Sequence, residues 1–189
     1  MLGSLVGEPV GDAQAQVALR VVASRAETFR NLLDRELDAA YRLAAVILND
    51  RVEAEDAVHD AAVAAWRGFD RLRDAASFDA WFRRILVTGC RDRLRVRARR
   101  RVVDLGRELV EAEHPQVADA SAAIADREAV DMALSALPPD EQVVIVLRFH
   151  ADLTVPAIGR LLGIPDGTVK SRLHAAIGRL RAALEESDR

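Results

Sequence analysis

Cysteine and histidine are scarce in this sequence, which holds one cysteine and four histidines. The single cysteine, Cys90, excludes an internal disulfide and a cysteine-based zinc site, so we expect it to be a small buried apolar residue. The histidines lack the spacing of metal ligands, and neither a glycine-rich phosphate loop nor a Ser/His/Asp arrangement is present. They are His59, His114, His150 and His174. We therefore predict no metal site, no cofactor and no enzymatic activity.

Aromatic residues and long apolar runs are also scarce. Aromatics are 4% of the chain although 50% of its residues are hydrophobic, and the abundance of Ala, Leu, Val and Arg favours helices over strands. No stretch reaches the about 18 consecutive apolar residues of a membrane span, and the start of the chain lacks the pattern of a signal peptide. The sequence therefore predicts an all-α, cytoplasmic protein without membrane insertion.

The net charge of −3 conceals two adjacent blocks of opposite sign. Residues 83–101 hold nine arginines and one acid, a charge of +8, and residues 104–141 hold ten acids and two arginines, a charge of −8. Because like charges at this density repel one another, the basic block needs either full solvation on a helix face or linker, or a polyanion or acidic protein opposite it. A nucleic-acid partner is one interpretation of this pattern.

Apolar spacing and turn residues divide the chain into two small helical domains. We predict a first domain over 27–101, a flexible acidic linker over 102–121 and a second domain over 122–189. In the first domain, spacing of i, i+3 and i+4 predicts one helix over about 27–48 and another with acids crowding its first turns over 52–69. A third helix follows Ser77, which is placed to be its N-cap. Residues 1–26 are predicted to be a partly disordered N-terminal extension.

The second domain contains the pattern of a helix-turn-helix. Thr154 is placed to cap a short helix and Gly163 to end it, and "GIPDGTVKSRLHAAIGRLR", residues 163–181, turns the chain into a second helix. On this second helix, small residues lie opposite the apolar stripe and basic residues flank them. Such a face fits a DNA major groove, with Thr168 to Arg172 nearest the base edges. The alternative is a helical hairpin with a solvated basic face.

Three stretches resemble a known family. The segment "ALPPDEQVVIVLRFHADLTVPAIGRLLGIPDGTVKSRLHAAIGRLRAAL" is similar to the promoter −35 element-binding domain of bacterial sigma factors. In the first domain, "AEDAVHDAAVAAW" stands where that family has its acidic polymerase-binding helix, and "FDAWFRRILVTGCRDRLR" resembles its strand-opening and −10-reading helix. The resemblance covers about residues 27–186, and two such domains with a short linker resemble the extracytoplasmic-function subclass.

The resemblance implies three sets of contact residues. Contacts to the polymerase clamp would fall on Glu55, Asp56, His59 and Asp60. Contacts to the −10 element would fall on Phe69, Arg71, Arg73, Phe78, Trp81, Thr88, Arg91 and Arg95. Contacts to the −35 element would fall on Thr168, Lys170, Ser171, Arg172, His174 and Arg179. Among the aromatics, we expect Phe78 to stack on an unpaired base and Trp81 to pack inside.

The chain departs from the family pattern at a few of these positions. His59 stands where Gln is common, Ala62 where an aromatic is common and Thr88 where Asn is common. "AIG", residues 157–159, replaces Glu-Ile-Ala, so Thr154 loses its usual capping-box partner. We therefore expect the first helix of the motif to be frayed or its phosphate contacts to be altered.

The implied function is that of a sigma factor, which binds core RNA polymerase, directs it to specific promoters and assists DNA melting. Two alternatives remain: a conventional helix-turn-helix regulator with an N-terminal effector or dimerisation domain, and a helical adaptor that does not bind DNA. The basic third helix after an aromatic cluster favours the sigma factor, because a conventional regulator needs no single-strand surface. An acidic linker tethered beside the basic block predicts weak promoter binding by the free protein. The sequence leaves open whether an anti-sigma protein is a partner.

Overall fold

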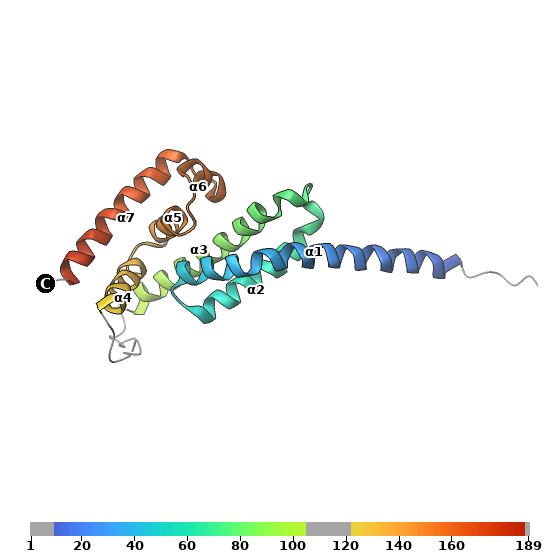
Figure 1. Cartoon of the computed structure of the whole chain (residues 1–189), viewed down its shortest axis with the longest axis horizontal. Coiled ribbons are helices and arrows are strands. Elements are labelled where there is room, and N and C mark those ends of the chain that lie inside the picture. Colours follow the sequence, from blue (N-terminus) through green and yellow to red (C-terminus); the bar gives the residue numbers. More distant parts are fainter. Residues whose placement is uncertain (1–9, 105–121, 188–189) are drawn as a thin grey trace, which may run out of the picture.

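The computed structural model describes residues 10–104 and 122–187, with side chains described for 23–101 and 128–186. The helices, in chain order, are α1 (Val10–Leu48), α2 (Arg51–Gly68), α3 (Phe78–Asp104), α4 (Ala122–Ser135), α5 (Pro139–Phe149), α6 (Val155–Leu162) and α7 (Asp166–Ser187). Two single 3-10 turns, Phe69–Arg71 and Ala75–Ser77, join α2 to α3. The described ranges contain no strand, which confirms the all-α prediction (Figure 1).

The first helix starts much earlier than expected, at Val10 instead of near residue 27. Arg25 shows that the helix packs with the first domain before residue 27. Its guanidinium lies 4.1 Å from the centre of the Trp66 ring and donates to the Trp66 carbonyl oxygen at 3.2 Å. It also pairs with Asp70 at 2.7 Å. The expected helix start is therefore wrong, while residues 1–9 of the predicted extension lie outside the described residues.

Local chemistry explains the break between α1 and α2. Asn49 has a φ of 49°, in the left-handed region that Asn tolerates better than most residues. Asp50 then accepts a hydrogen bond from the Glu53 backbone N–H at 2.9 Å and so caps α2. The buried stripe of α2 consists of small residues, which leave its larger polar residues on the outer face. These buried residues are Ala54, Ala57, Val58, Ala61 and Ala65.

Six of the chain's eight aromatic residues form one cluster where α1, α2 and α3 meet. They are Phe29, Trp66, Phe69, Phe78, Trp81 and Phe82. Phe78 lies at its centre, with four other rings at centroid distances of 5.7 to 6.2 Å. Cys90 is fully buried in the same apolar core, as expected, and burial raises the pKa of its thiol to about 12.

The helix-turn-helix is present where the sequence predicts it. Thr154 accepts a hydrogen bond from the Ala157 N–H at 3.4 Å, and α6 runs regularly from Val155, so the expected fraying is not observed. Gly163 ends α6 with a φ of 67°, a conformation that glycine adopts without strain. In contrast, the capping oxygen before α3 comes from Asp74, which accepts from the Ala76 N–H, and not from Ser77.

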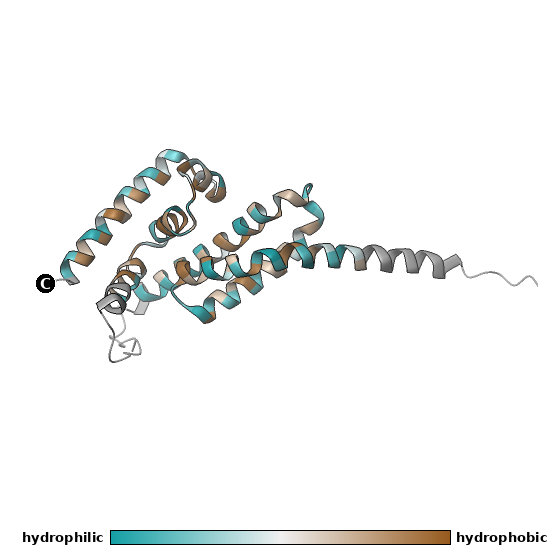
Figure 2. Ribbon diagram, viewed as in Figure 1, coloured by the Kyte–Doolittle hydropathy of each residue, from teal (hydrophilic) through white to brown (hydrophobic). Residues whose placement is uncertain are grey.

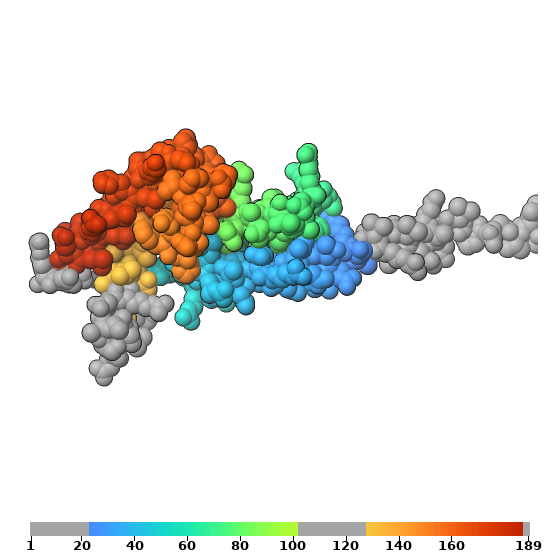
Figure 3. Space-filling view, turned by 45° about the horizontal axis from the view of Figure 1, so that its top comes forward, coloured from blue at the N-terminus to red at the C-terminus, as the bar shows by residue number. Residues whose placement is uncertain are grey.

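The two predicted domains pack directly against each other. One apolar cluster contains buried residues of α1, α2 and α3 together with Val143, Val144, Val146 and Leu147 of α5 and Ile158 of α6. Figure 2 shows α5 as mostly hydrophobic, and Figure 3 shows the C-terminal helices in contact with the N-terminal ones. The sequence predicted only a tether between them, and most of that tether, residues 105–121, lies outside the described residues.

The end of α1 is the polar part of this interdomain contact. The last carbonyl groups of a helix have no partner within the helix. Gln142 of α5, which is 2% exposed, donates to the Ile47 carbonyl oxygen at 2.9 Å. Arg97 of α3 donates to the neighbouring Leu48 carbonyl oxygen at 3.0 Å. Hydrogen bonds from α3 and α5 therefore satisfy these two carbonyl groups at the end of α1.

No described helix combines the length and the apolar character that a membrane span requires.

Candidate nucleic-acid interface

The acidic residues of α2 lie on its solvent side, opposite the stripe of small buried residues. Glu55, Asp56, His59 and Asp60 are all exposed. Asp60 is paired with Arg93 of α3, although the Asp60 side chain remains 70% exposed. The outer face of α2 is therefore acidic and accessible, as a surface that docks on a basic partner must be.

The arginine block of α3 is partly neutralised inside the protein. Arg93 pairs with Asp60 of α2, and Arg97 pairs with Glu53 of the same helix. Arg95 reaches across to the C-terminal domain, where its Nη2 donates to both carboxylate oxygens of Asp140 at 2.8 and 3.0 Å. Intramolecular ion pairs therefore explain part of a charge that was expected to face either solvent or a polyanion.

The candidate −10 residues differ widely in accessibility. Arg71, Arg73 and Thr88 are exposed, and the Thr88 hydroxyl donates to the Arg84 carbonyl oxygen at 2.7 Å. Phe69, Trp81, Arg91 and Arg95 are half-buried. The Nε of Arg91 is buried and has no hydrogen-bond partner among the described residues. The loop arginines are therefore the most accessible cations of this set.

The expected stacking role of Phe78 is contradicted by its burial. Phe78 is 2% exposed at the centre of the aromatic cluster, so it cannot stack on a base in this conformation. Trp81 is half-buried, and its indole lies against Gly68, where an added Cβ would be 3.2 Å from the ring. The prediction failed because i, i+3 spacing shows that two residues share a face but not how deep each one lies. Of these two aromatics, Trp81 is the one with surface available for stacking.

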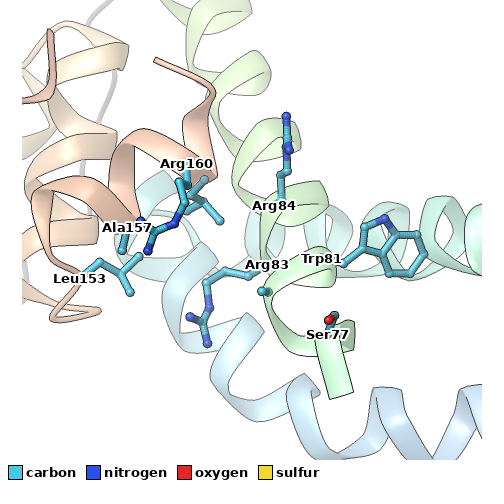
Figure 4. Close-up of a pocket in the computed structure, with 9 residues that line it drawn as sticks. Ser77, Trp81, Arg83, Arg84, Leu153, Ala157 and Arg160 are labelled. Atoms are coloured by element: carbon cyan, nitrogen blue, oxygen red, sulfur yellow. The ribbon is translucent and has the colours of Figure 1, made fainter. Parts of the chain in front are cut away.

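A pocket of about 390 Å³ separates the start of α3 from α6. It is lined by Ser77, Ala80, Trp81, Arg83, Arg84, Leu153, Ala157, Arg160 and Leu161. Figure 4 shows the α3 residues on one side and Leu153, Ala157 and Arg160 on the other, with the Trp81 ring turned away from Arg160. The first helix of the helix-turn-helix therefore faces the N-terminal half of α3 across this pocket. Some of the expected −10 residues lie in that half of α3.

The outer face of α7 has the predicted arrangement. Val169 and Ala176 are buried, while Lys170, Ser171 and His174 are exposed. The Ser171 hydroxyl donates to the carbonyl oxygen of half-buried Thr168 at 3.0 Å. Small and polar side chains thus occupy the centre of the exposed face and cations its edges.

Two of the flanking arginines on α7 are held by the first turn of α5. The Arg172 Nη2 lies 2.9 Å from Oδ2 of Asp140, and Arg179 pairs with Glu141. Because Asp140 also accepts from Arg95, one carboxylate holds a candidate −10 residue and a candidate −35 residue together. Asp140 and its two arginines are each between 26% and 38% exposed at the side chain.

Comparison with known proteins assigns this arrangement to a family. Residues 133–182 match the family model for sigma-70, region 4, and residues 32–100 match that for sigma-70 region 2. The ECF RNA polymerase sigma factor SigM of Mycobacterium tuberculosis is 32% identical over 172 residues, which cover 91% of this chain and 85% of SigM. The chain belongs to the ECF RNA polymerase sigma factors.

Other relatives agree with this assignment. The RNA polymerase sigma-E factor of Streptomyces avermitilis is 31% identical over 85% of this chain and 87% of its own length. The sigma factor RpoE from Bartonella quintana, solved in complex with the anti-sigma factor NepR, superposes with a TM-score of 0.62 at 26% identity. The match covers 83% of this chain and 96% of RpoE. The resemblance inferred from the sequence is therefore confirmed, and this sigma factor functions in transcription initiation.

Sequence reasoning missed the residues that connect region 2 with region 4 in this sigma factor. Asp140 and Glu141 follow a Pro-Pro pair, and acids in a first helical turn are explained by the helix dipole alone. Gln142 was not singled out, because the sequence around a single polar residue in an apolar helix does not indicate its hydrogen-bond partner, here the Ile47 carbonyl oxygen. Arg160 was overlooked as one cation of the short first helix of the motif, although it lines the interdomain pocket.

Proposed function

We propose that this sigma factor binds core RNA polymerase through the outer face of α2 and reads promoter DNA with α3 and α7. One observation carries the proposal: a single chain presents an acidic face on α2 and a basic-edged face with a small centre on α7. A polymerase subunit and a DNA duplex require these opposite surfaces. The protein has a regulatory role and performs no catalysis of its own, and it acts in the cytoplasm beside its polymerase.

In the polymerase contact, Glu55 and Asp56 supply the charge and His59 and Asp60 extend the face by one helical turn. Because the residues beneath them are small and fully packed, α2 presents these side chains without rearranging its own domain. Exposed charges contribute little to stability, so this face is free to serve binding. Its acidity suits a basic groove on the partner.

At the −10 element, Arg71 and Arg73 contact the phosphates of the opened strand and Trp81 stacks on a base. The exposed arginines lie in the connection between α2 and α3, and the half-buried indole lies in the first turn of α3. Stacking on an aromatic side chain stabilises a bound base by about 1–3 kcal/mol. Thr88, Arg91 and Arg95 lie further along α3 and extend the contact to the duplex.

At the −35 element, α7 enters the major groove. Thr168, Lys170 and Ser171 in its first two turns approach the base edges, and His174 follows on the same face. Arg172 and Arg179 contact DNA only after they leave Asp140 and Glu141. An anti-sigma protein is a further partner that we propose, because the similar sigma factor RpoE was solved with one.

Run-off transcription tests the proposal. The full chain is added to purified core polymerase with a library of promoter fragments, and core polymerase alone is the control. We expect transcripts from a subset of fragments that share −35 and −10 sequences. An active core preparation that yields no promoter-specific transcript with this chain would overturn the sigma-factor function. Sequence-selective DNA binding without polymerase stimulation would instead favour the conventional regulator.

A further inference from the structure

Asp140 is the point where the two DNA-reading surfaces meet. It lies in the first turn of α5, and its carboxylate accepts from Arg95 of α3 at 2.8 and 3.0 Å. The same carboxylate lies 2.9 Å from the Arg172 guanidinium on α7. The first pair joins region 2 to region 4, and the second lies within region 4. One acid therefore neutralises a cation of each proposed DNA contact.

Neighbouring contacts support the same closed arrangement. Gln142, two residues after Asp140, donates to the end of α1, and Arg179 is held by Glu141. Across the pocket, α6 faces Ser77, Arg83 and Arg84 at the start of α3. These contacts hold region 4 against region 2 in this conformation.

We propose that Asp140 is an interdomain clasp that holds region 4 against region 2 in the free sigma factor and keeps Arg95 and Arg172 from promoter DNA. Separation of the two regions releases Arg95 directly. Once region 4 turns toward DNA, a phosphate replaces Asp140 as the partner of Arg172. The clasp thus occupies one proposed DNA-contacting arginine of each region until region 4 turns toward DNA. The proposal rests on the proposed function, because promoter DNA is the ligand of the released arginines.

The ion pairs of the clasp are weak enough to break reversibly. The three side chains are 26% to 38% exposed, so solvent screens the pairs in part and polymerase binding can break them. The masking residues differ from those of the acidic linker, most of which lies outside the described residues. A masking effect at Asp140 therefore persists when linker acids are neutralised, whereas linker masking does not.

The experiment measures domain separation and DNA binding in the full chain. Donor and acceptor dyes are attached through Asp38→Cys on α1 and Glu186→Cys on α7, both exposed positions. Cys90 is fully buried and does not react with the dyes in the folded protein. The test variant is Asp140→Asn. The matched control is Asp152→Asn, which removes the same charge from a side chain that is 97% exposed and paired only within region 4.

For Asp140→Asn we expect lower energy transfer than in the parent and about three- to tenfold tighter binding to a promoter duplex at low salt. The Asp152→Asn protein is expected to match the parent in energy transfer. Its DNA affinity reports the effect of the charge alone. The difference between the two variants should shrink as salt rises, because salt screens the clasp.

Equal energy transfer and equal DNA affinity in the two variants would overturn the clasp. If Asp140→Asn lowers energy transfer without tighter DNA binding, the masking role is overturned. If Asp140→Asn loses helix content by circular dichroism, Asp140→Ser provides the same test, because Ser is well accepted in the first turn of a helix. Energy transfer needs neither polymerase nor promoter, so failure of the clasp is distinguishable from failure of run-off transcription.

Discussion

Arg95 of region 2 and Arg172 of region 4 both reach Oδ2 of Asp140, at 3.0 and 2.9 Å. This shared carboxylate means that two cations expected to contact different promoter elements are occupied by the protein itself. It also means that a substitution at either arginine changes the closed state as well as the DNA contact. Substitutions in this region therefore require separate measurements of folding, partner binding and DNA binding.

The first prediction concerns Arg172 on the DNA-facing helix. Arg172→Ala should weaken promoter binding by the holoenzyme by about 1–3 kcal/mol and relax preference at one −35 position, because a guanidinium lost from a base edge removes its discrimination. Affinities for a set of single-base −35 variants measure this. Uniform weakening across all sequences would assign Arg172 to phosphate. Unchanged affinity and preference would show that α7 enters DNA in another orientation.

The second prediction concerns the acidic face of α2. Asp56→Arg should strongly weaken binding to core polymerase and leave the fold intact, because an exposed acid contributes little to stability. A pull-down measures binding and circular dichroism checks the fold. Glu185→Arg is the matched control, since it reverses an exposed acid near the C-terminal end of α7, where a cation is favoured. Undiminished binding by folded Asp56→Arg would move the polymerase contact to another surface.

The third prediction separates Trp81 from Phe78. Trp81→Ala should weaken holoenzyme binding to a single-stranded −10 oligonucleotide by about 1–3 kcal/mol, and Trp81→Tyr should retain most of it. Phe78→Ala should instead lower the free energy of unfolding by about 3–5 kcal/mol, because Phe78 is 2% exposed among four rings. Urea unfolding and oligonucleotide anisotropy distinguish the two. Wild-type oligonucleotide binding by Trp81→Ala would exclude the stacking role.

The fourth prediction concerns Gly159, where the family pattern has alanine. A Cβ at this position would lie 2.8 Å from Oδ1 of Asp166 and 2.9 Å from the Ile164 carbonyl oxygen, so the turn between α6 and α7 must shift. Gly159→Ala should destabilise region 4 by about 1–3 kcal/mol and weaken −35 binding. Gly89→Ala on α3 is the control, because nothing lies within 4 Å of its added Cβ. It should stabilise the protein by about 0.5–1 kcal/mol. Equal unfolding midpoints for the two variants would contradict the close packing at Gly159.

Local features of the sequence were sufficient for much of this protein. Apolar periodicity predicted the helices, and Thr154 and Gly163 predicted the bounds of α6, because caps depend on residues a few positions apart. The exposed face of α7 followed from helical geometry alone. The start of α1 was missed because Trp66 and Asp70, the residues that Arg25 contacts, are distant from it in sequence.

Only the tertiary structure decided which of these faces are accessible. Depth of burial depends on all neighbouring elements, so the spacing of Phe78 and Trp81 could not rank them. The partners of Arg95, Arg97 and Gln142 lie on other helices, at positions that local periodicity does not connect. The sequence by itself therefore determined the helices, the motif and the family. Packing within region 4, and of region 4 on region 2, determined which cations face solvent and which are held by Asp140, because an ion pair forms only where folding brings distant residues within a few ångströms.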